Sequence, residues 1–297
     1  MRNTDAFSNC HPAVNFVFFL GAIIFGVTLT HPAYLVAGVV LGAVYYLLLH
    51  GRKGWQMILG LIPMFLVLTL INPFFNQYGR TVLFTVFGRK YSVEALIYGA
   101  DIAAVFVVTM LWFGCYNAVM TSDKFTALFG NLIPALSLVL VMVLRMIPSL
   151  VRKAGQIIGA RKSIGKGLGE QSSKKDMLSD GMTVLSALTS WALEGSVVTG
   201  DSMRARGYGA AKRSSFHLYT MKTLDWTLIA TTVLLAGFVL FEMLSGGTAA
   251  EFTPRIKIAP ITGSHILGLA AYCLYLLIPT ILHIKEAIQW HISKSRI

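Results

Sequence analysis

Two short motifs place an arginine after an alanine where a helix is expected to end. The first consists of Ala160, Arg161 and Lys162, and the second of Ala205, Arg206 and Gly207. A glycine suits the left-handed conformation just past a helix end, and the small alanine lets that end enter a groove. The planar arginine side chain can pair bidentately with a carboxylate. The two copies together suit a partner with two equivalent acidic grooves, such as a dimer, whereas either copy alone also fits a solvated basic helix end.

Motifs of catalysis are missing from the sequence. The stretch from Gly159 to Gly167 resembles a P-loop, but its spacing is one residue too long and a glycine replaces the hydroxyl residue that would bind Mg²⁺. Neither HExxH nor GxSxG occurs. Cys10, Cys115 and Cys273 stand alone without metal-ligand spacing and are expected to be buried small residues. We therefore expect no catalytic residue, no bound metal and no cofactor in this chain.

The composition predicts a membrane protein. Of the 297 residues, 55% are hydrophobic and 13% are charged, whereas a soluble domain has roughly 25% charged residues. No Asp, Glu, Lys or Arg occurs from Ala6 through Gly51, and about 20 apolar residues suffice for a helix to cross a bilayer. A soluble enzyme or a free nucleic-acid binder is therefore disfavoured.

The apolar stretches predict an all-α, polytopic fold with about six transmembrane helices. They are Ala13–Leu29, Tyr34–Leu49, Trp55–Ile71, Ala95–Met120, Trp226–Leu244 and His265–His283. Gly38 and Gly42 form a small-xxx-small pair that permits a close helix contact. Asp101 is expected either to make a buried polar contact or to cap a helix that begins at that point, and Glu242 is expected at the membrane interface.

The basic residues predict the orientation. With both termini in the cytoplasm, 20 of the 25 Lys and Arg residues lie on the inside, as the positive-inside rule requires. The uncharged segment Phe125–Leu144 is long enough to conflict with this topology. If it crossed the membrane, the basic region that follows it would lie outside. We interpret it as an interfacial or protein-packed helix on the cytoplasmic side, with a true or partial span as the alternative.

A basic central region separates two groups of spans. Arg145–Lys222 has 13 basic residues and five acidic ones. It contains two helical candidates, Pro148–Arg161 and Met182–Arg206, joined by a Gly/Ser/Lys-rich connection over Lys162–Asp180. One face of the second candidate is formed by Met182, Leu185, Leu188, Ala192 and Leu193. The predicted domains are therefore N-terminal transmembrane helices (1–120), a cytoplasmic coupling domain (121–223) and C-terminal transmembrane helices (224–297).

Over most of its length the chain resembles the transmembrane T component of energy-coupling-factor (ECF) transporters, which import vitamins and sometimes transition-metal ions. The resemblance lies in the start Cys10-His11-Pro12, the segment Arg145-Met146-Ile147-Pro148 and the two Ala-Arg motifs. Its most specific part is the run from Ser202 to Gly209. The first motif departs from the family pattern, since Lys162 stands where a glycine is usual.

The resemblance implies a coupling subunit of the bacterial plasma membrane that is not itself an enzyme and does not bind nucleic acid. In that family two cytosolic ABC ATPases and a small membrane S component, which binds the substrate, assemble on the T component. Arg161 and Arg206 would each meet acidic residues in a groove of one ATPase, and ATP-driven closure would move the coupling helices and reorient the S component. Apolar residues would contact each other or the S component: Leu150, Ile157, Leu185, Leu188 and Trp191.

Other functions stay open at this point. The chain is also compatible with a T component dedicated to a cobalt or nickel importer. A multi-pass enzyme acting on a phosphorylated or lipid substrate would need clustered acid, base or metal-binding residues, which the sequence does not display. A membrane-anchored nucleic-acid binder is disfavoured because the basic region has few aromatic residues for stacking on bases. The sequence does not indicate the transported substrate.

Overall fold

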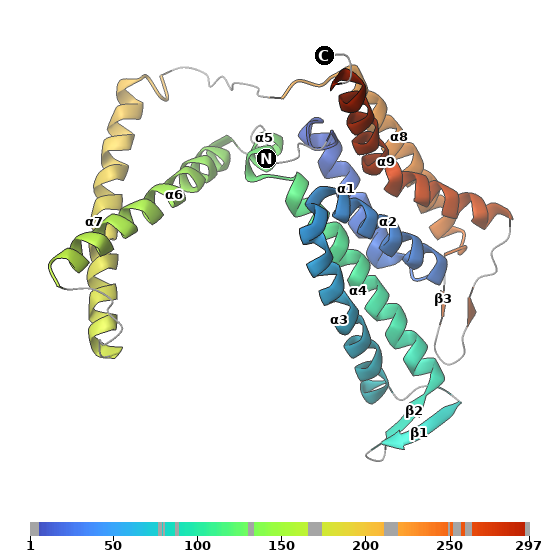
Figure 1. Cartoon of the computed structure of the whole chain (residues 1–297). Helices are drawn as coiled ribbons and strands as arrows, with labels where there is room; N and C mark the ends of the chain where they lie inside the picture. The colour runs from blue at the N-terminus through green and yellow to red at the C-terminus, as the bar shows by residue number, and fades with distance from the viewer. Residues whose placement is uncertain are drawn as a thin grey trace. The chain divides into compact units, whose positions relative to one another are not determined.

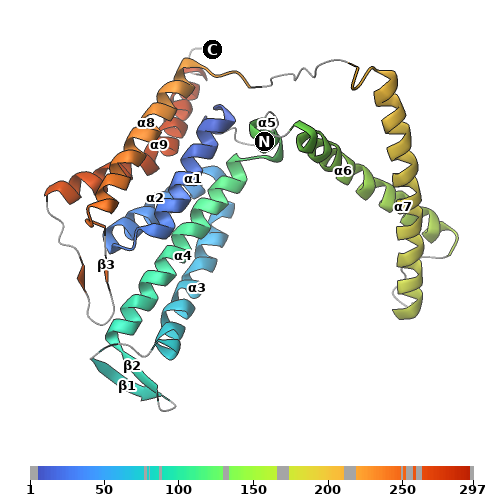
Figure 2. The ribbon, with the colours of Figure 1, turned by 180° about the vertical axis from the view of Figure 1, so that it is seen from behind.

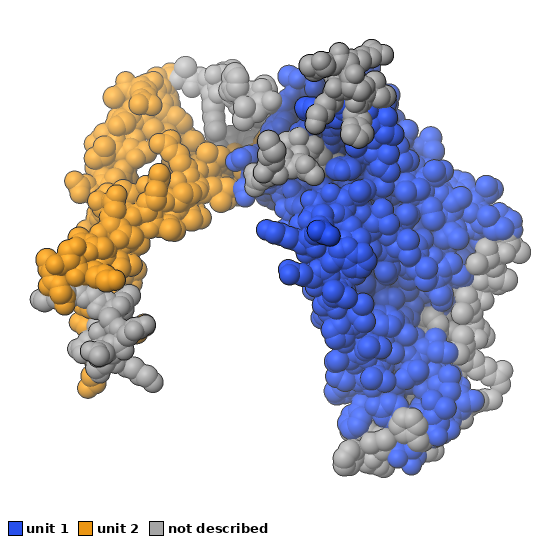
Figure 3. Space-filling model, in the orientation of Figure 1, with its two compact units in different colours: residues 1–125, 219–297 blue, residues 126–218 orange. Residues whose placement is uncertain are grey.

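The computed structural model describes residues 6–76, 79, 81–86, 89–129, 134–165, 174–210, 219–248, 250–251, 257–258 and 263–294. The chain divides into two compact units (Figure 3). Residues 1–125 and 219–297 form the first, called here the membrane unit, and residues 126–218 form the second, called here the central unit. The two groups of apolar helices, far apart in the sequence, thus belong to one unit.

Long helices dominate the membrane unit (Figure 1). They are α1 (Pro12–Thr28), α2 (Pro32–His50), α3 (Gly54–Phe75), α4 (Val93–Val119), α8 (Thr223–Leu244) and α9 (Gly263–Lys294), with the 3-10 turn η1 (Gly51–Lys53) between α2 and α3. α3 packs along α4, and α8 packs along α9 (Figure 2). The short helix α5 (Ser122–Phe129) follows α4.

The helices have the length and composition of membrane spans. Four apolar stretches of the described chain are long enough to cross a bilayer: Pro32–Phe75, Val93–Val119, Thr223–Leu244 and His265–Trp290. The first of these comprises both α2 and α3, and α1 is a further apolar helix of 17 residues. The chain is accordingly a helical membrane protein, and the number of six spans stays a prediction.

The first two helices begin in the same way. His11 precedes Pro12 and caps α1, because its Nδ1 accepts a hydrogen bond from the Ala13 amide at 3.2 Å. His31 caps α2 through the same contact with the Ala33 amide, also at 3.2 Å. Proline suits the first position of a helix, because a backbone N–H there would have no acceptor within the helix and its absence costs nothing. The repeated His-Pro-Ala sequence is therefore a helix start.

Aromatic side chains fill the centre of the membrane unit. The Phe18 ring lies against Trp112 of α4 and stacks on Tyr275 of α9, with centroids 5.8 and 5.1 Å apart. Tyr275 also donates a hydrogen bond to the Phe18 carbonyl at 2.7 Å, so its hydroxyl is satisfied in the interior. α1 is thereby held between α4 and α9.

The predicted glycine contact is confirmed. A Cβ atom at Gly38 would lie 3.2 Å from the Val108 side chain, and one at Gly42 would lie 3.1 Å from Nε1 of Trp112. α2 and α4 therefore approach closely along this small-residue face.

Two local predictions are wrong. The predicted span Trp55–Ile71 ends too early, because α3 continues through Pro73 to Phe75. Asp101 does not cap a helix, because α4 begins at Val93 and Ser92 caps it through a hydrogen bond from the Ala95 amide. Asp101 is instead buried inside α4, with 8% of its surface exposed.

Glu242 makes a buried contact with the following helix. It is buried near the end of α8, with 3% of its surface exposed, and its Oε2 lies 3.0 Å from Nδ1 of His265 in the first turn of α9. This pair joins two successive helices, and the interfacial position of Glu242 stays a prediction.

Two antiparallel hairpins complete the described part of the membrane unit. β1 (Val82–Val86) pairs with β2 (Arg89–Ser92) between α3 and α4. β3 (Ala250–Glu251) pairs with β4 (Lys257–Ile258) between α8 and α9. Both hairpins connect successive apolar helices.

The central unit contains two long helices that pack against each other, α6 (Pro134–Ser163) and α7 (Lys174–Ala205). The predicted helix start at Pro148 is wrong, because Pro148 lies inside α6. The uncharged segment Phe125–Leu144 is likewise divided, since its first residues belong to α5 and its last to α6, with 130–133 outside the described residues. Part of the predicted connection, 166–173, also lies outside them.

Candidate functional site

The second arginine motif forms a well-defined helix end. Ala205 is the last residue of α7, and Gly207 follows with a positive φ of 80°. The Tyr208 amide donates to the Met203 carbonyl at 3.0 Å, and the Gly207 amide donates to the Arg204 carbonyl at 2.9 Å. These two bonds define a Schellman motif, which satisfies carbonyls at the helix end. The predicted left-handed glycine after the helix is confirmed.

Arg206 is presented to solvent by this helix end. Its side chain is exposed, as are those of Ala205 and Tyr208. Within the described residues the Arg206 guanidinium makes no hydrogen bond or ion pair, whereas its backbone amide is fixed by the Ser202 carbonyl at 3.2 Å. The hydrogen-bonded backbone thus holds a cation that has no partner among the described residues.

The first motif has a different geometry. α6 does not end at Arg161 but continues to Ser163, and the residue with positive φ is Gly165, at 70°. The Gly165 amide donates to the Lys162 carbonyl at 3.1 Å. Lys162 therefore occupies a helical position and needs no glycine, which gives a physical reason for the departure from the pattern of the second motif. Ala160 and Lys162 are exposed.

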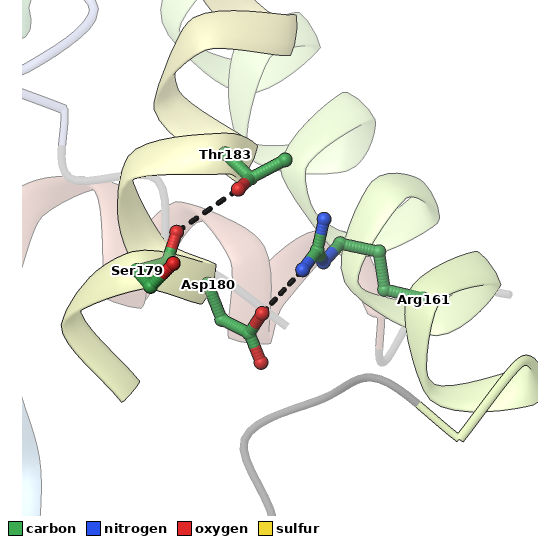
Figure 4. Close-up of polar contacts among 4 residues, drawn as sticks. All are labelled: Arg161, Ser179, Asp180 and Thr183. Carbon is green, nitrogen blue, oxygen red and sulfur yellow. Dashed lines mark hydrogen bonds and ion pairs between the residues drawn. The ribbon is translucent and has the colours of Figure 1, made fainter. Parts of the chain in front are cut away.

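Arg161 is already paired inside the central unit. Its guanidinium forms an ion pair with Oδ1 of Asp180, which lies in the second turn of α7 (Figure 4). Both side chains are about one-fifth exposed, at 20% and 22%. The next turn of α7 is fixed by a hydrogen bond from the Thr183 hydroxyl to the Ser179 carbonyl at 2.9 Å. The pair connects the last turn of α6 to α7.

A second contact joins the same two helices. Nζ of Lys153 lies 5.8 Å from the ring centroid of Trp191, a cation–π geometry. The half-buried residues recur at helical spacing on both helices: Leu150, Lys153, Ile157 and Arg161 on α6, and Asp180, Val184, Leu188 and Trp191 on α7. One face of each helix is therefore used for mutual packing, with the ion pair at one end of it.

The residues of the predicted apolar face of α7 differ in exposure. Leu188 and Ala192 are half-buried, whereas Met182, Leu185 and Leu193 are exposed. The hydrophobic pattern did not distinguish residues that meet α6 from residues that face outward. The exposed ones form an apolar surface on the central unit.

The arrangement brings together neither the two motifs nor a catalytic constellation. Arg161 and Arg206 lie at the C-terminal ends of two different helices, one paired and one exposed. In the described ranges no group of three or more His, Cys, Asp or Glu residues could hold a metal ion. The chemistry available is the binding of carboxylates by guanidinium groups.

The sequence interpretation missed the role of Asp180. It counted this residue only among five acids in a basic region, although an acid within reach of a helix-end arginine is a natural partner. Its distance of 19 residues from Arg161 gave no hint of the contact, because the fold of the connection decides whether the two meet.

Comparison with known proteins does not extend this description. No protein-family model matches the sequence, and a search of curated proteins finds no match.

Proposed function

We propose that this chain is the non-catalytic transmembrane coupling subunit of an ECF-type ABC importer in a bacterial plasma membrane. It connects two cytosolic ABC ATPases to a small S component that binds the substrate, and it transmits ATP-driven motion between them for vitamin uptake. The observation that supports this most is the end of α7, where a Schellman motif holds Arg206 exposed and, within the part of the chain that the structure describes, without a partner. Such an arginine is suited to an acidic groove on another protein.

The two arginines have unequal roles in this proposal. Arg206 binds the first ATPase directly, because no internal contact of the described chain must be broken. Arg161 binds the second ATPase only after it leaves Asp180, or while it shares that carboxylate. The Arg206 contact is therefore the stronger of the two, and the Arg161 contact is the one that internal rearrangement can modulate.

The helices between these ends supply the mechanical connection. α6 and α7 have 30 and 32 residues, so each is about 45–48 Å long at 1.5 Å per residue. Their shared face, with the Lys153–Trp191 contact and the Arg161–Asp180 pair, makes them move together. The exposed apolar residues of α7 would contact the S component.

The test is copurification of a tagged chain from its native membrane in mild detergent, followed by identification of the bound proteins. We expect two ABC ATPase subunits and a small hydrophobic protein. Arg206→Ala should weaken ATPase association by roughly 30-fold to several thousand-fold, since truncating one partner of a buried charge pair costs about 2–5 kcal/mol. Arg161→Ala should have a smaller effect because the other contact remains.

Arg152→Ala is the matched control, since it removes the same charge from an exposed position of α6. It should leave ATPase association unchanged. Normal ATPase binding and uptake in the Arg161→Ala, Arg206→Ala double variant would refute the mechanism. The identity of the copurified S component distinguishes a vitamin importer from a cobalt or nickel importer.

A further inference from the structure

A buried lysine lies in the membrane unit where the chain leaves for the central unit. Lys124, in α5, has 6% of its surface exposed. Its ammonium group donates to the Ser8 carbonyl, to the Ser8 hydroxyl at 2.9 Å and to the Val119 carbonyl at 2.8 Å. An ammonium group has three protons to donate, and these oxygens are among the acceptors within their reach. Lys124 thus fastens the end of α4 to a segment 116 residues earlier in the chain.

Asn15 extends this network into α1. In the amide orientation that satisfies both of its ends, it donates to the Phe7 carbonyl at 2.8 Å and accepts from Lys124 Nζ at 3.3 Å. Asn15 is fully buried. A buried amide without partners would cost free energy, so this residue specifies where the segment before α1 must lie.

A buried aspartate lies where the chain returns from the central unit. Asp225, in the first turn of α8, has 3% of its surface exposed. Its Oδ1 accepts from the His11 amide at 3.1 Å, and its Oδ2 accepts from the Lys222 amide at 2.9 Å. The His11 ring also meets the Tyr219 ring edge-on, with centroids 6.4 Å apart. The start of α8 is thereby fastened to the same N-terminal segment.

The segment between these contacts, Ala6–His11, is itself compact. The Asn9 amide donates to the Ala6 carbonyl at 3.1 Å, and the Cys10 amide donates to the Phe7 carbonyl at 3.2 Å. The Phe7 ring is fully buried against Phe18, with centroids 5.2 Å apart. We call Ala6–His11 the N-terminal anchor. Its turn and its buried ring allow it to behave as one rigid piece.

We propose that the N-terminal anchor mechanically couples the two points at which the chain leaves and re-enters the membrane unit, with Lys124 and Asp225 as its positioning residues. Lys124 holds the exit side and Asp225 holds the return side, and each binds the anchor at a different residue, Ser8 and His11. A displacement at either point is passed to the other through the anchor. This inference does not depend on the proposed function.

The test is hydrogen–deuterium exchange of the full chain in detergent micelles, with the Lys124→Met variant. Methionine keeps an unbranched apolar side chain but removes every hydrogen bond of the ammonium group. Exchange should rise about tenfold or more in Ala6–His11, because hydrogen bonds from a charged group are lost. The decisive readout is the peptide covering 219–226, on the return side. Its exchange should rise as well, whereas a purely local role of Lys124 would leave it unchanged.

Asp225→Asn provides the reciprocal measurement and retains a side chain of the same shape, so it serves if Lys124→Met fails to fold. It should raise exchange at 120–125, on the exit side. Asp123→Asn, an exposed neighbour of Lys124 in α5, is the control and should change neither region. The proposal is overturned if Lys124→Met raises exchange only on the exit side and in the anchor, and Asp225→Asn raises it only on the return side and in the anchor.

Discussion

At the scale of single residues, the surroundings of Arg161 and Arg206 decide what each can bind. A guanidinium that already has a carboxylate partner must give up that contact, or share it, before it binds another. For an exposed guanidinium, the only cost of binding is the loss of its own hydration. Because the Arg161–Asp180 pair is partly exposed, its intrinsic strength is modest, about 0–1 kcal/mol. It can therefore be displaced by a better-matched acidic groove.

Substitutions of Asp180 and of Arg161 should therefore change the affinity for the ATPase in opposite directions. If Arg161 docks on an ATPase, Asp180→Asn should increase ATPase affinity by up to about fivefold, because a competing pair of about 1 kcal/mol is removed. Arg161→Ala should decrease the affinity. The measurement is titration of the purified ATPase onto the chain in nanodiscs. A decrease of the same size in both variants would mean that the ion pair serves only to hold α6 and α7 together.

The buried contact between Glu242 and His265 predicts a stability effect. Glu242→Gln keeps the size of the side chain but replaces a charged hydrogen-bond acceptor with a neutral one, which costs about 1 kcal/mol. For a membrane unit of this size we expect the Tm to fall by about 2–4 °C. Thermal unfolding in detergent measures it, with Asp123→Asn, an exposed acid, as the control. An unchanged Tm would show that the pair contributes nothing.

The sequence could predict residue types at the site but not their partners. The left-handed Gly207 followed from local chemistry, since a glycine after a helical stretch has few other uses there. Asp180, Lys124 and Asp225 were not recognised, because each finds its partner through the tertiary fold. For Asp225 the sequence does contain a local signal, because acidic residues are common in the first turn of a helix.

At the scale of elements, the contact between α2 and α4 depends on Gly42. Gly42→Leu should destabilise the membrane unit by about 1–3 kcal/mol, because its side chain would overlap Trp112. Gly60→Leu is the matched control, since a Cβ at Gly60 meets no atom within 4 Å. Thermal unfolding of both variants in the same detergent checks this. Equal stability of the two would contradict the proposed packing.

The end of α7 allows a comparison of two glycines. Gly207→Ala forces an alanine into the left-handed region, at a cost of roughly 1–2 kcal/mol. The helix end should then fray, and ATPase binding through Arg206 should weaken. Gly200→Ala, inside α7 with open space around it, should strengthen the helix by up to about 1 kcal/mol and preserve binding. Loss of binding in both variants would refute the role of the Schellman motif.

Prolines explain why element boundaries were predicted poorly. Pro63 and Pro73 lie inside α3, Pro148 inside α6 and Pro279 inside α9. In water a proline in a helix interior is costly, so Pro73 and Pro148 were interpreted as boundaries. In membrane helices, such as α3 and α9, the freed backbone carbonyl is satisfied by neighbouring groups and the proline is tolerated. Pro148 lies in α6, which is not among the candidate spans of the described chain, and the structure offers no such reason for it.

At the scale of the whole molecule, the charge distribution fixes a testable orientation. With the basic central region in the cytoplasm, a cysteine at Ser202 should react with a membrane-impermeant thiol reagent only after cells are permeabilised. A cysteine at Thr85, exposed in the β1–β2 hairpin, should react in intact cells. Each new cysteine is introduced into a variant in which Cys10, Cys115 and Cys273 have been replaced. The reverse labelling pattern would place the arginine motifs outside and exclude cytosolic ATPases as partners.

The subunit composition of the intact assembly shows whether this chain joins two ATPases to an S component. Native mass spectrometry of the tagged chain, extracted from its own membrane, measures which subunits are bound and in what number. We expect one copy of this chain with two ABC ATPase subunits and one small hydrophobic protein, and loss of the ATPases in the Arg161→Ala, Arg206→Ala variant. A chain that is found alone or only with copies of itself, with uptake intact, would contradict it.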